Sequence, residues 1–465
     1  MKKLFLIVVF AMLFPTLLDA QIRLAEMQNF HTGLTASYTL PSKLGYGYKR
    51  VQLELGSPYV GIANSALSLD AFQHIQKFKK ISVSGMDKAV SRLGGNNGFY
   101  AGMESQIIQL GLTFKKFSYR TPVYVGVGIR ERAEASLFYN SDVLNLLYSG
   151  NKQFAGESIN LSTKVNVLQY TDYSVIAAYP FQYKLKDSSI LHIKPALRFR
   201  YLRSGFNVHT QYANNSLYTD ANGKYMGLGF DYAIQTAMSI DTPDVTRNLP
   251  LEVSLNQLMS KPAGHGFALD FGATAFLAEN MVFNIGLIDI GKINYKHNIL
   301  QYSSNKTYRF DGYPAYGYEQ STNPSSSLDS LEAFSTPEKS YETYSVPLPT
   351  KLILSFEYKT GHFLFKRMHT FRHNLSVIYV QGFRNYLSST KKQILDIGYV
   401  YSMQNKINAG LHIMLGGHSR FGIGPQITLK LGSFRLGFLS NNMLGVIYPS
   451  KARGLDISMN AGMSF

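Results

Sequence analysis

Apolar and polar residues alternate strictly along the last stretch of the chain. From residue 455 onward the odd positions are apolar and the even positions are polar or small, which sets Leu455, Ile457, Met459, Ala461, Met463 and Phe465 against Asp456, Ser458, Asn460, Gly462 and Ser464. A period of two predicts a β-strand with one apolar face and one polar face. The apolar face suits the core of a soluble sandwich or the lipid-facing side of a membrane barrel.

The same alternation recurs along most of the chain. It is clearest at 123–130, 191–201, 267–274, 395–402, 407–415 and 421–431, and segments of this kind number roughly 14 to 16. Long two-faced strands have to close on themselves to avoid unpaired edges in lipid, and glycines recur on the polar faces. The pattern therefore predicts an all-β fold, a transmembrane antiparallel β-barrel of about 14 strands. A soluble exported β-sandwich or propeller is the alternative.

The polar faces of these strands carry charges that a closed barrel would enclose. The predicted lumen-facing residues are His192, Lys194, Arg198, Arg200, Asp270, Asp396, Lys430 and Asp456. A buried charge without a partner is costly, so the simplest interpretation is that these side chains pair with one another inside a filled barrel. A conductive or ligand-guiding lumen is the other interpretation.

Three segments have helical periodicity instead. Residues 68–80 and 142–148 are predicted to form short helices, the second capped by Ser149-Gly150, and residues 251–259 form a third candidate. In a barrel such helices lie in loops or in the lumen, where they form a plug, a lid, a docking surface or plain loop decoration. Residues 301–349, rich in Ser, Thr, Tyr and Pro, are predicted to be a long irregular loop with a short helix at 328–334.

Residues 1–20 have the pattern of a secretory signal peptide. Lys2 and Lys3 precede an apolar run, and Leu18-Asp19-Ala20 stands at the expected cut. We therefore expect a mature barrel domain over 21–465 that is exported to the outer membrane. No Cys follows the cut, which argues against a lipid anchor, and no other apolar stretch reaches the ~18 residues of a spanning helix.

Composition narrows the candidate chemistry. The chain has no Cys, which excludes disulfides and thiolate ligands, and no Trp, so its 32 Tyr and 30 Phe have to form the aromatic girdles of a barrel. The net charge of +17 suits anionic headgroups of outer-membrane lipid, lipopolysaccharide or an acidic partner. No nucleic-acid recognition motif accompanies the charge, so no nucleic-acid partner is expected.

Motifs of enzymes are absent from the sequence. There is no G-x-S-x-G, H-E-x-x-H or P-loop motif. His362, His369 and His373 lie in a basic run, where two of them at a spacing of four could bind a metal. No carboxylate accompanies them, and a basic hairpin turn or a headgroup contact is the simpler interpretation. We expect no catalytic residue, no cofactor and no metal.

Five stretches occur together in a characteristic order. They are LNLLYSGN (144–151), GHGFALDFGATAF (264–276), LIDIGKINY (287–295), LPTKLILSFEY (348–358) and SNNMLGVIYPSKA (440–452). As a set they resemble a Bacteroidota family of outer-membrane barrels of unknown function, which is itself similar to the group containing the fatty-acid transporter FadL and the type IX secretion protein PorV. The resemblance implies a barrel of about 14 strands and no assigned activity. Members of that family begin with an Asn-Pro-Ala stretch, whereas this chain reads SYTLPSK at 37–43.

Three functions remain open at this point. A FadL-like channel would pass a hydrophobic or small ligand; apolar patches along the pore would support it, and a lumen filled throughout by paired charges would exclude it. A PorV-like anchor or scaffold would bind a secretion-system protein or an assembly machine through its loops, above all through 301–349. The third is a surface component without transport.

The terminal aromatic residue gives the first testable prediction. Phe465 is expected to lie at a membrane interface on the strand that closes the barrel, and it resembles the signal read by the outer-membrane assembly machinery. Replacing Phe465 with Asp should lower the amount of protein assembled in the outer membrane, measured by membrane fractionation. Unchanged outer-membrane levels of the Phe465→Asp variant would contradict this role.

Overall fold

The computed structural model describes residues 27–28, 34–43, 50–69, 87, 90–94, 97–114, 123–184, 190–239, 261–278, 280–311, 336–360, 372–403 and 406–465. The expected signal peptide (1–20), the candidate helices at 251–259 and 328–334, and most of the one at 68–80 lie outside these residues.

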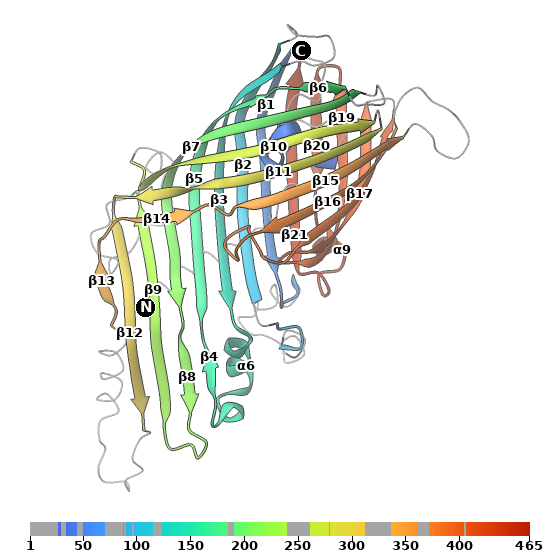
Figure 1. Cartoon of the computed structure of the whole chain (residues 1–465). Coiled ribbons are helices and arrows are strands. Elements are labelled where there is room, and N and C mark those ends of the chain that lie inside the picture. Colours follow the sequence, from blue (N-terminus) through green and yellow to red (C-terminus); the bar gives the residue numbers. More distant parts are fainter. Residues whose placement is uncertain are drawn as a thin grey trace, which may run out of the picture.

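A closed ring of antiparallel strands forms the body of the protein (Figure 1). Within the described residues the ring has 14 strands, each paired with its neighbours in chain order, as predicted. They are β1 (Val51–Asn64), β2 (Asn97–Phe114), β3 (Val123–Tyr139), β5 (Thr163–Ala178), β7 (Ile190–Ala213), β10 (Gly264–Ala278), β11 (Met281–Tyr295), β15 (Lys351–Thr360), β16 (His373–Gly382), β17 (Ile394–Met403), β18 (Ile407–Gly416), β19 (Arg420–Leu431), β20 (Phe434–Leu439) and β21 (Gly454–Ser464).

The ring closes where β21 pairs with β1. Val60 lies opposite Ile457 in this pair. Beyond the last strand, the Phe465 amide donates to the Val51 carbonyl at 2.9 Å, and the Val51 amide returns a bond to Phe465 at 3.2 Å. No edge is therefore left open between these two strands.

Alternation along each strand sorts the side chains into two environments. On β7, Leu197 and Phe199 are 46% and 47% exposed, while the intervening Arg198 is completely buried. On β10, Phe267 is 59% exposed and Asp270 is completely buried. The ring thus carries an apolar band on its outside and encloses its polar side chains, the reverse of a soluble globular protein.

The two ends of the ring differ in the lengths of their connections. Val51 and Phe465 share one end, called the terminal end below, where a two-residue turn at Gly432 and Ser433 joins β19 to β20. Gly432 adopts a φ of 62°, a left-handed conformation that favours glycine. At the opposite end, called the loop end, the β20–β21 connection runs over 440–453 and includes the short helix α9 (Leu444–Ile447).

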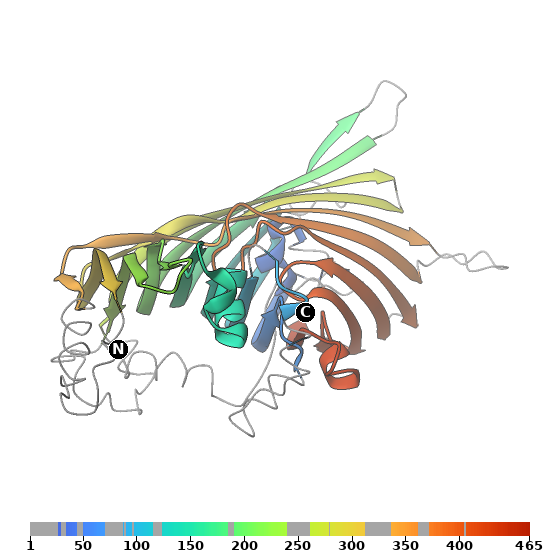
Figure 2. The same ribbon diagram turned by 90° about the horizontal axis from the view of Figure 1, so that it is seen from below.

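A second, smaller set of strands extends the sheet beyond the ring at the loop end (Figure 1). β7 is 24 residues long, and past the ring it pairs with β9 (Met226–Met238), which pairs in turn with β12 (Ile299–Phe310). Short strands complete this sheet extension: β4 (Ser158–Asn160), β8 (Ser216–Thr219) and β13 (Glu338–Ser340). Figure 2 shows the extension from below, continuous with one side of the ring.

The prediction of an irregular loop over 301–349 is partly wrong. Residues 301–310 belong to β12 because β9 hydrogen-bonds along the whole of that strand, from Ile299 to Phe310. Two further pieces of the range are β13 and β14 (Tyr344–Pro347), the second paired with β11. Residues 312–335 lie outside the described part of the chain.

The helix predicted at 142–148 is present as α6 (Ser141–Ser149). Asn140 caps its start by accepting a bond from the Asp142 amide, and Gly150 ends it with a φ of 74°. Leu147 is 72% exposed, so α6 lies outside the lumen, beside β4 at the loop end (Figure 1). Among the described residues no helix has both the length and the apolar character needed to cross a membrane.

Close packing on the inner face gives a test of the fold. A Cβ at Gly424 would lie 1.9 Å from the Ser440 carbonyl oxygen, whereas one at Gly227 in the sheet extension would meet nothing nearer than 3.7 Å. Gly424→Ala should destabilise the barrel by about 1–3 kcal/mol, measured by urea unfolding in detergent. Gly227→Ala is the matched control and should leave the midpoint in place; equal midpoints for both variants would contradict this packing.

Candidate functional site

A short segment from near the start of the chain fills the lumen at the terminal end. Every residue over 34–43 is buried, and the segment contains α3 (Ala36–Thr39) and the 3₁₀ turn η1 (Pro41–Lys43). We call residues 34–43 the plug segment. η1 packs against β7 and β10 on the inner face of the ring.

Tyr38 of the plug segment is enclosed by side chains of the ring wall. Its ring lies between two guanidinium groups, with Arg130 Cζ 4.2 Å and Arg198 Cζ 3.9 Å from the ring centroid. Its hydroxyl lies 3.2 Å from Ser174 Oγ. Desolvated cation–π contacts of this kind contribute about 2 kcal/mol each. A Cβ at Gly128 would lie 2.6 Å from the same hydroxyl, so the glycine at this position of the wall leaves room for the tyrosine.

Polar bonds hold both ends of the plug segment. Lys43 makes a buried ion pair with Glu357 on β15, and Thr274 Oγ1 donates to Ser42 Oγ at 2.8 Å. Toward the other end, Thr35 Oγ1 donates to Glu54 Oε2 at 3.0 Å. All of these contacts are non-covalent.

Gln28 makes a second contact between the first described residues and the wall. Its side-chain amide donates to Asp396, and its backbone carbonyl accepts from Asn374 Nδ2 at 2.6 Å. Asp396 Oδ2 also lies 2.6 Å from His412 Nδ1, and His412 Nε2 lies 2.8 Å from the Ser440 carbonyl oxygen. Both ring nitrogens of this histidine are therefore engaged.

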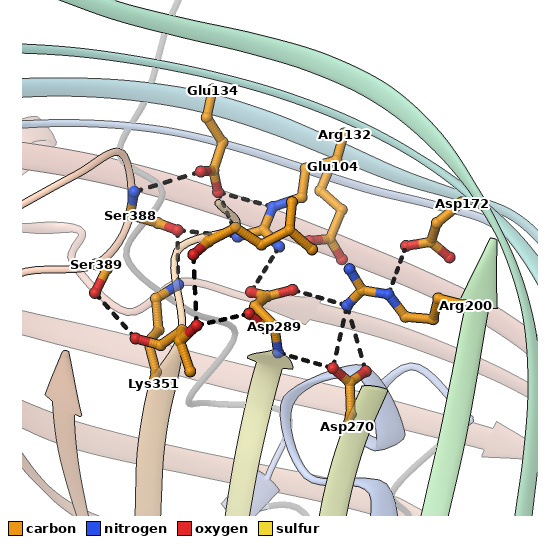
Figure 3. A network of polar contacts seen from close by, with 12 residues as sticks. Glu104, Arg132, Glu134, Asp172, Arg200, Asp270, Asp289, Lys351, Ser388 and Ser389 are labelled. Carbon is orange, nitrogen blue, oxygen red and sulfur yellow. Dashed lines mark hydrogen bonds and ion pairs between the residues drawn. The ribbon is translucent and has the colours of Figure 1, made fainter. Parts of the chain in front are cut away.

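The middle of the lumen is crossed by a network of charged side chains (Figure 3). We call it the charge network; it contains five cationic and five acidic residues, namely Arg130, Arg132, Arg198, Arg200 and Lys351 with Glu104, Glu134, Asp172, Asp270 and Asp289. The charges of this set cancel. Cancellation is what burial requires, because an unpaired charge in the interior costs several kcal/mol.

Asp289 joins two halves of the network. One of its carboxylate oxygens lies 3.0 Å from Arg132 Nη1 and the other 2.7 Å from Arg200 Nη1. Its backbone adopts a φ of 59°, which Asp tolerates better than most residues. Its amide donates to Asp270 Oδ1 at 2.8 Å. The position is a β-bulge, since Leu269 pairs with Ile290 whereas Phe271 pairs with Leu287.

A loop from the other end of the ring reaches the same network. Residues 386–390 of the β16–β17 connection are all buried, and we call them the inner loop. Ser388 Oγ accepts from Arg132 Nη2 at 2.9 Å and from Lys351 Nζ at 2.6 Å. The Leu387 amide donates to Ser136 Oγ at 3.2 Å. The plug segment and the inner loop therefore occupy the lumen from its two ends.

Apolar layers separate these polar contacts. On the loop side of the charge network lies an aromatic cluster that includes Tyr59, Tyr100, Tyr170, Tyr295, Tyr344 and Tyr386 with several leucines and isoleucines. On the plug side, Leu34 packs with Tyr124 and Ile176. The described lumen is thus not filled throughout by paired charges, the arrangement that would exclude a channel.

A histidine lies beside the aromatic cluster at the loop end. His418, between β18 and β19, stacks on Tyr100 with ring centroids 5.6 Å apart. Burial lowers the pKa of His418 to about 4. The ring is therefore uncharged at neutral pH, which suits its apolar neighbours.

The residues predicted to face the lumen fall in several places. Lys194, Arg198, Arg200, Asp270, Asp396 and Asp456 are buried inside the ring, whereas His192 and Lys430 are half-buried. Arg198 and Arg200 both contact Asp270. Asp396 belongs to the Gln28 contact, and Asp456 accepts from Asn441 Nδ2 at 2.9 Å.

Sequence reasoning missed other members of the site. The alternation of β3 continues through Arg130, Arg132 and Glu134. This regular spacing could have predicted that the three side chains face the lumen. Of the three histidines considered for a metal, His362 and His369 lie outside the described residues. His373 is described, and its Nδ1 lies 2.6 Å from Tyr399 Oη.

Comparison with known proteins places the chain in a family. The model of the family described as "Family of unknown function (DUF5723)" matches residues 49–441. The chain belongs to the DUF5723 family. No match was found among curated protein sequences.

Several solved structures are similar to the DUF5723 barrel. The toluene transporter TodX of Pseudomonas putida has 10% sequence identity and a TM-score of 0.43, with 94% of this chain and 95% of TodX covered. The toluene transporter TbuX of Ralstonia pickettii has 9% identity and a TM-score of 0.42, with 94% and 95% covered. A Pseudomonas aeruginosa FadL homologue has 8% identity and a TM-score of 0.38, with 93% and 94% covered.

Neutralising Asp289 tests the charge network of the DUF5723 barrel. Asp289→Asn keeps a residue that tolerates positive φ but leaves Arg132 and Arg200 with surplus buried charge. It should lower the free energy of unfolding by about 3–5 kcal/mol, measured by urea unfolding in detergent. The control is Asp311→Asn, which removes the acidic partner of Arg309 from an ion pair that is about two-thirds exposed. This variant should change the free energy of unfolding by less than about 1 kcal/mol. Equal effects of the two variants would contradict the network's role.

Proposed function

We propose that this DUF5723 protein is an outer-membrane channel for a small hydrophobic solute, held closed by the plug segment and the inner loop. The observation that carries the proposal is the plug segment itself. It is a buried element that lies across the lumen and is attached to the wall only by non-covalent contacts, such as Tyr38 between Arg130 and Arg198. An element of this kind can leave without unfolding the ring.

Placement in the outer membrane is supported by the surface of the ring. Leu197, Phe199 and Phe267 belong to an apolar band that would be costly in water and favourable in lipid. The signal-peptide pattern at 1–20 supports export. Short connections at the terminal end and longer ones at the loop end suit a periplasmic and an outward side respectively.

A hydrophobic solute is supported by the composition of the lumen. The aromatic cluster around Tyr100, Tyr170 and Tyr295 gives an apolar region on the loop side. The charge network cancels to zero and so offers no surplus charge to attract an ion of one sign. The members of the charge network are engaged with one another, and the activity that we propose is passage.

One observation favours a second function, that of a scaffold. The sheet extension, formed by β4, β8, β9, β12 and β13, continues beyond the ring at the loop end. A channel does not require such a structure. A surface that projects past the membrane is suited to bind a protein partner, so a PorV-like anchor is the alternative.

Removing the two closing elements tests the channel. Deleting residues 34–43 should increase the entry of a small apolar solute into proteoliposomes, and deleting residues 386–390 as well should add a measurable ionic conductance in planar bilayers. The matched control is deletion of residues 221–224, an exposed turn of the sheet extension. It should change neither the entry of the solute nor the ionic conductance.

Folding of each deletion variant is checked by the slower gel mobility of the heat-denatured form. A folded double-deletion variant that passes neither solute nor ions would contradict the channel and favour the scaffold. A variant that conducts would support the plug segment and the inner loop as the closing elements.

A further inference from the structure

A patch of Arg, Lys and His side chains lies on the outside of the ring at the loop end. Arg203 on β7 pairs directly with His265 on β10, and Lys292 on β11 pairs with Phe267 on β10. Lys296 and His297 follow β11, and both of their amides donate to the Ala263 carbonyl at the start of β10. We call Arg203, Lys292 and Lys296 the cationic patch; the imidazole rings of His265 and His297 lie beside them.

Exposure and mutual position make the patch one surface. His265, Lys292, Lys296 and His297 are exposed and Arg203 is half-buried. Arg203 lies opposite His265 in the β7–β10 pair, and Lys296 and His297 lie near the same imidazole ring.

Aromatic rings lie directly below the patch, toward the middle of the apolar band. Tyr201 stacks on His265 with ring centroids 5.9 Å apart, and its hydroxyl lies 2.7 Å from His265 Nδ1. Tyr201 also contacts Tyr173 and Phe267, at 6.3 and 5.5 Å between centroids. Below them, Phe199 and Leu197 continue the apolar face.

This order of side chains matches the layers of a membrane leaflet. Apolar residues suit the acyl chains, aromatic residues suit the interface, and Arg and Lys suit the phosphates of the headgroups. Arg binds phosphate oxygens through two parallel N–H bonds, and Lys adds a compact positive charge. The order runs continuously along β7, β10 and β11.

We infer that the cationic patch is a binding site for the phosphorylated headgroup of a membrane lipid in the leaflet at the loop end. The acyl chains of that lipid lie along the outward residues of β7 and β10, and Arg203 and Lys292 hold its phosphate. The inference rests on the proposed placement in the outer membrane but not on transport. It differs from non-specific attraction because it assigns the lipid to three adjacent strands of the ring.

Native mass spectrometry of the full chain in nanodiscs tests this inference. The probe is lipid A, a phosphorylated glycolipid, mixed with a zwitterionic phospholipid. The double variant Arg203→Gln/Lys292→Gln should retain roughly tenfold to thirtyfold less lipid A than the unchanged protein, as expected when two cationic side chains that contact the headgroup are neutralised. Lys152→Gln/Lys224→Gln removes the same charge from exposed positions of the loop end and should retain as much as the unchanged protein.

Two further arms identify the bound group. Lipid A stripped of its phosphates should bind the unchanged protein no better than it binds the patch variant, and millimolar inorganic phosphate should not displace intact lipid A. Equal retention of lipid A by the patch and control variants would overturn the site, as would equal binding of the dephosphorylated lipid.

The same samples separate this inference from the proposed function. Heat-modifiable gel mobility shows whether each variant is folded in the nanodisc. A folded, inserted protein that does not select phosphorylated lipid contradicts the patch alone. A protein that does not insert at all contradicts the membrane placement on which both proposals rest.

Discussion

One constraint governs the whole structure: a single-layer sheet that turns its apolar side chains outward has to satisfy every polar group that it encloses. Arg198 and Arg200 follow from the alternation that exposes Leu197 and Phe199, and their burial is acceptable only because carboxylates meet them. Asp270 and Asp289 supply those carboxylates. The polar interior is therefore a consequence of the apolar exterior, and the matching of charges is what makes it stable.

The same constraint explains why segments of the polypeptide chain occupy the lumen. The inner face of the ring presents hydrogen-bond donors and guanidinium groups, and the plug segment and the inner loop meet them with Tyr38 and Ser388. Because these two elements contact the wall only through side-chain bonds and packing, the free energy that holds them is a sum of small terms. In the proposed channel, a closed state built in this way would be stable and still separable from the ring.

The ring was predictable from the sequence because a period of two is a local property, and the terminal alternation ending at Phe465 indicates both a strand and its exposed face. The inward position of Asp289 was not predictable because the residue lies in a β-bulge. The outward residues of β11 have odd numbers from Met281 to Leu287, whereas beyond the bulge, at Lys292, the outward residue has an even number. The seat of Tyr38 depends on contacts between distant parts of the chain. Residues 301–310 fell within the predicted loop because of their Ser, Thr and Tyr content, and pairing with β9, which the sequence does not reveal, makes them part of a strand.

We propose that the plug segment leaves the lumen when solute passes. The chain has no Cys, so Ser37→Cys places a unique thiol at a completely buried position of the plug, and its labelling by a membrane-impermeant thiol reagent can be timed in proteoliposomes. The thiol of the Ser37→Cys variant should be labelled while the protein is folded, and adding an apolar solute should speed the labelling in step with solute entry. Labelling that occurs only after unfolding, while solute still enters, would contradict it.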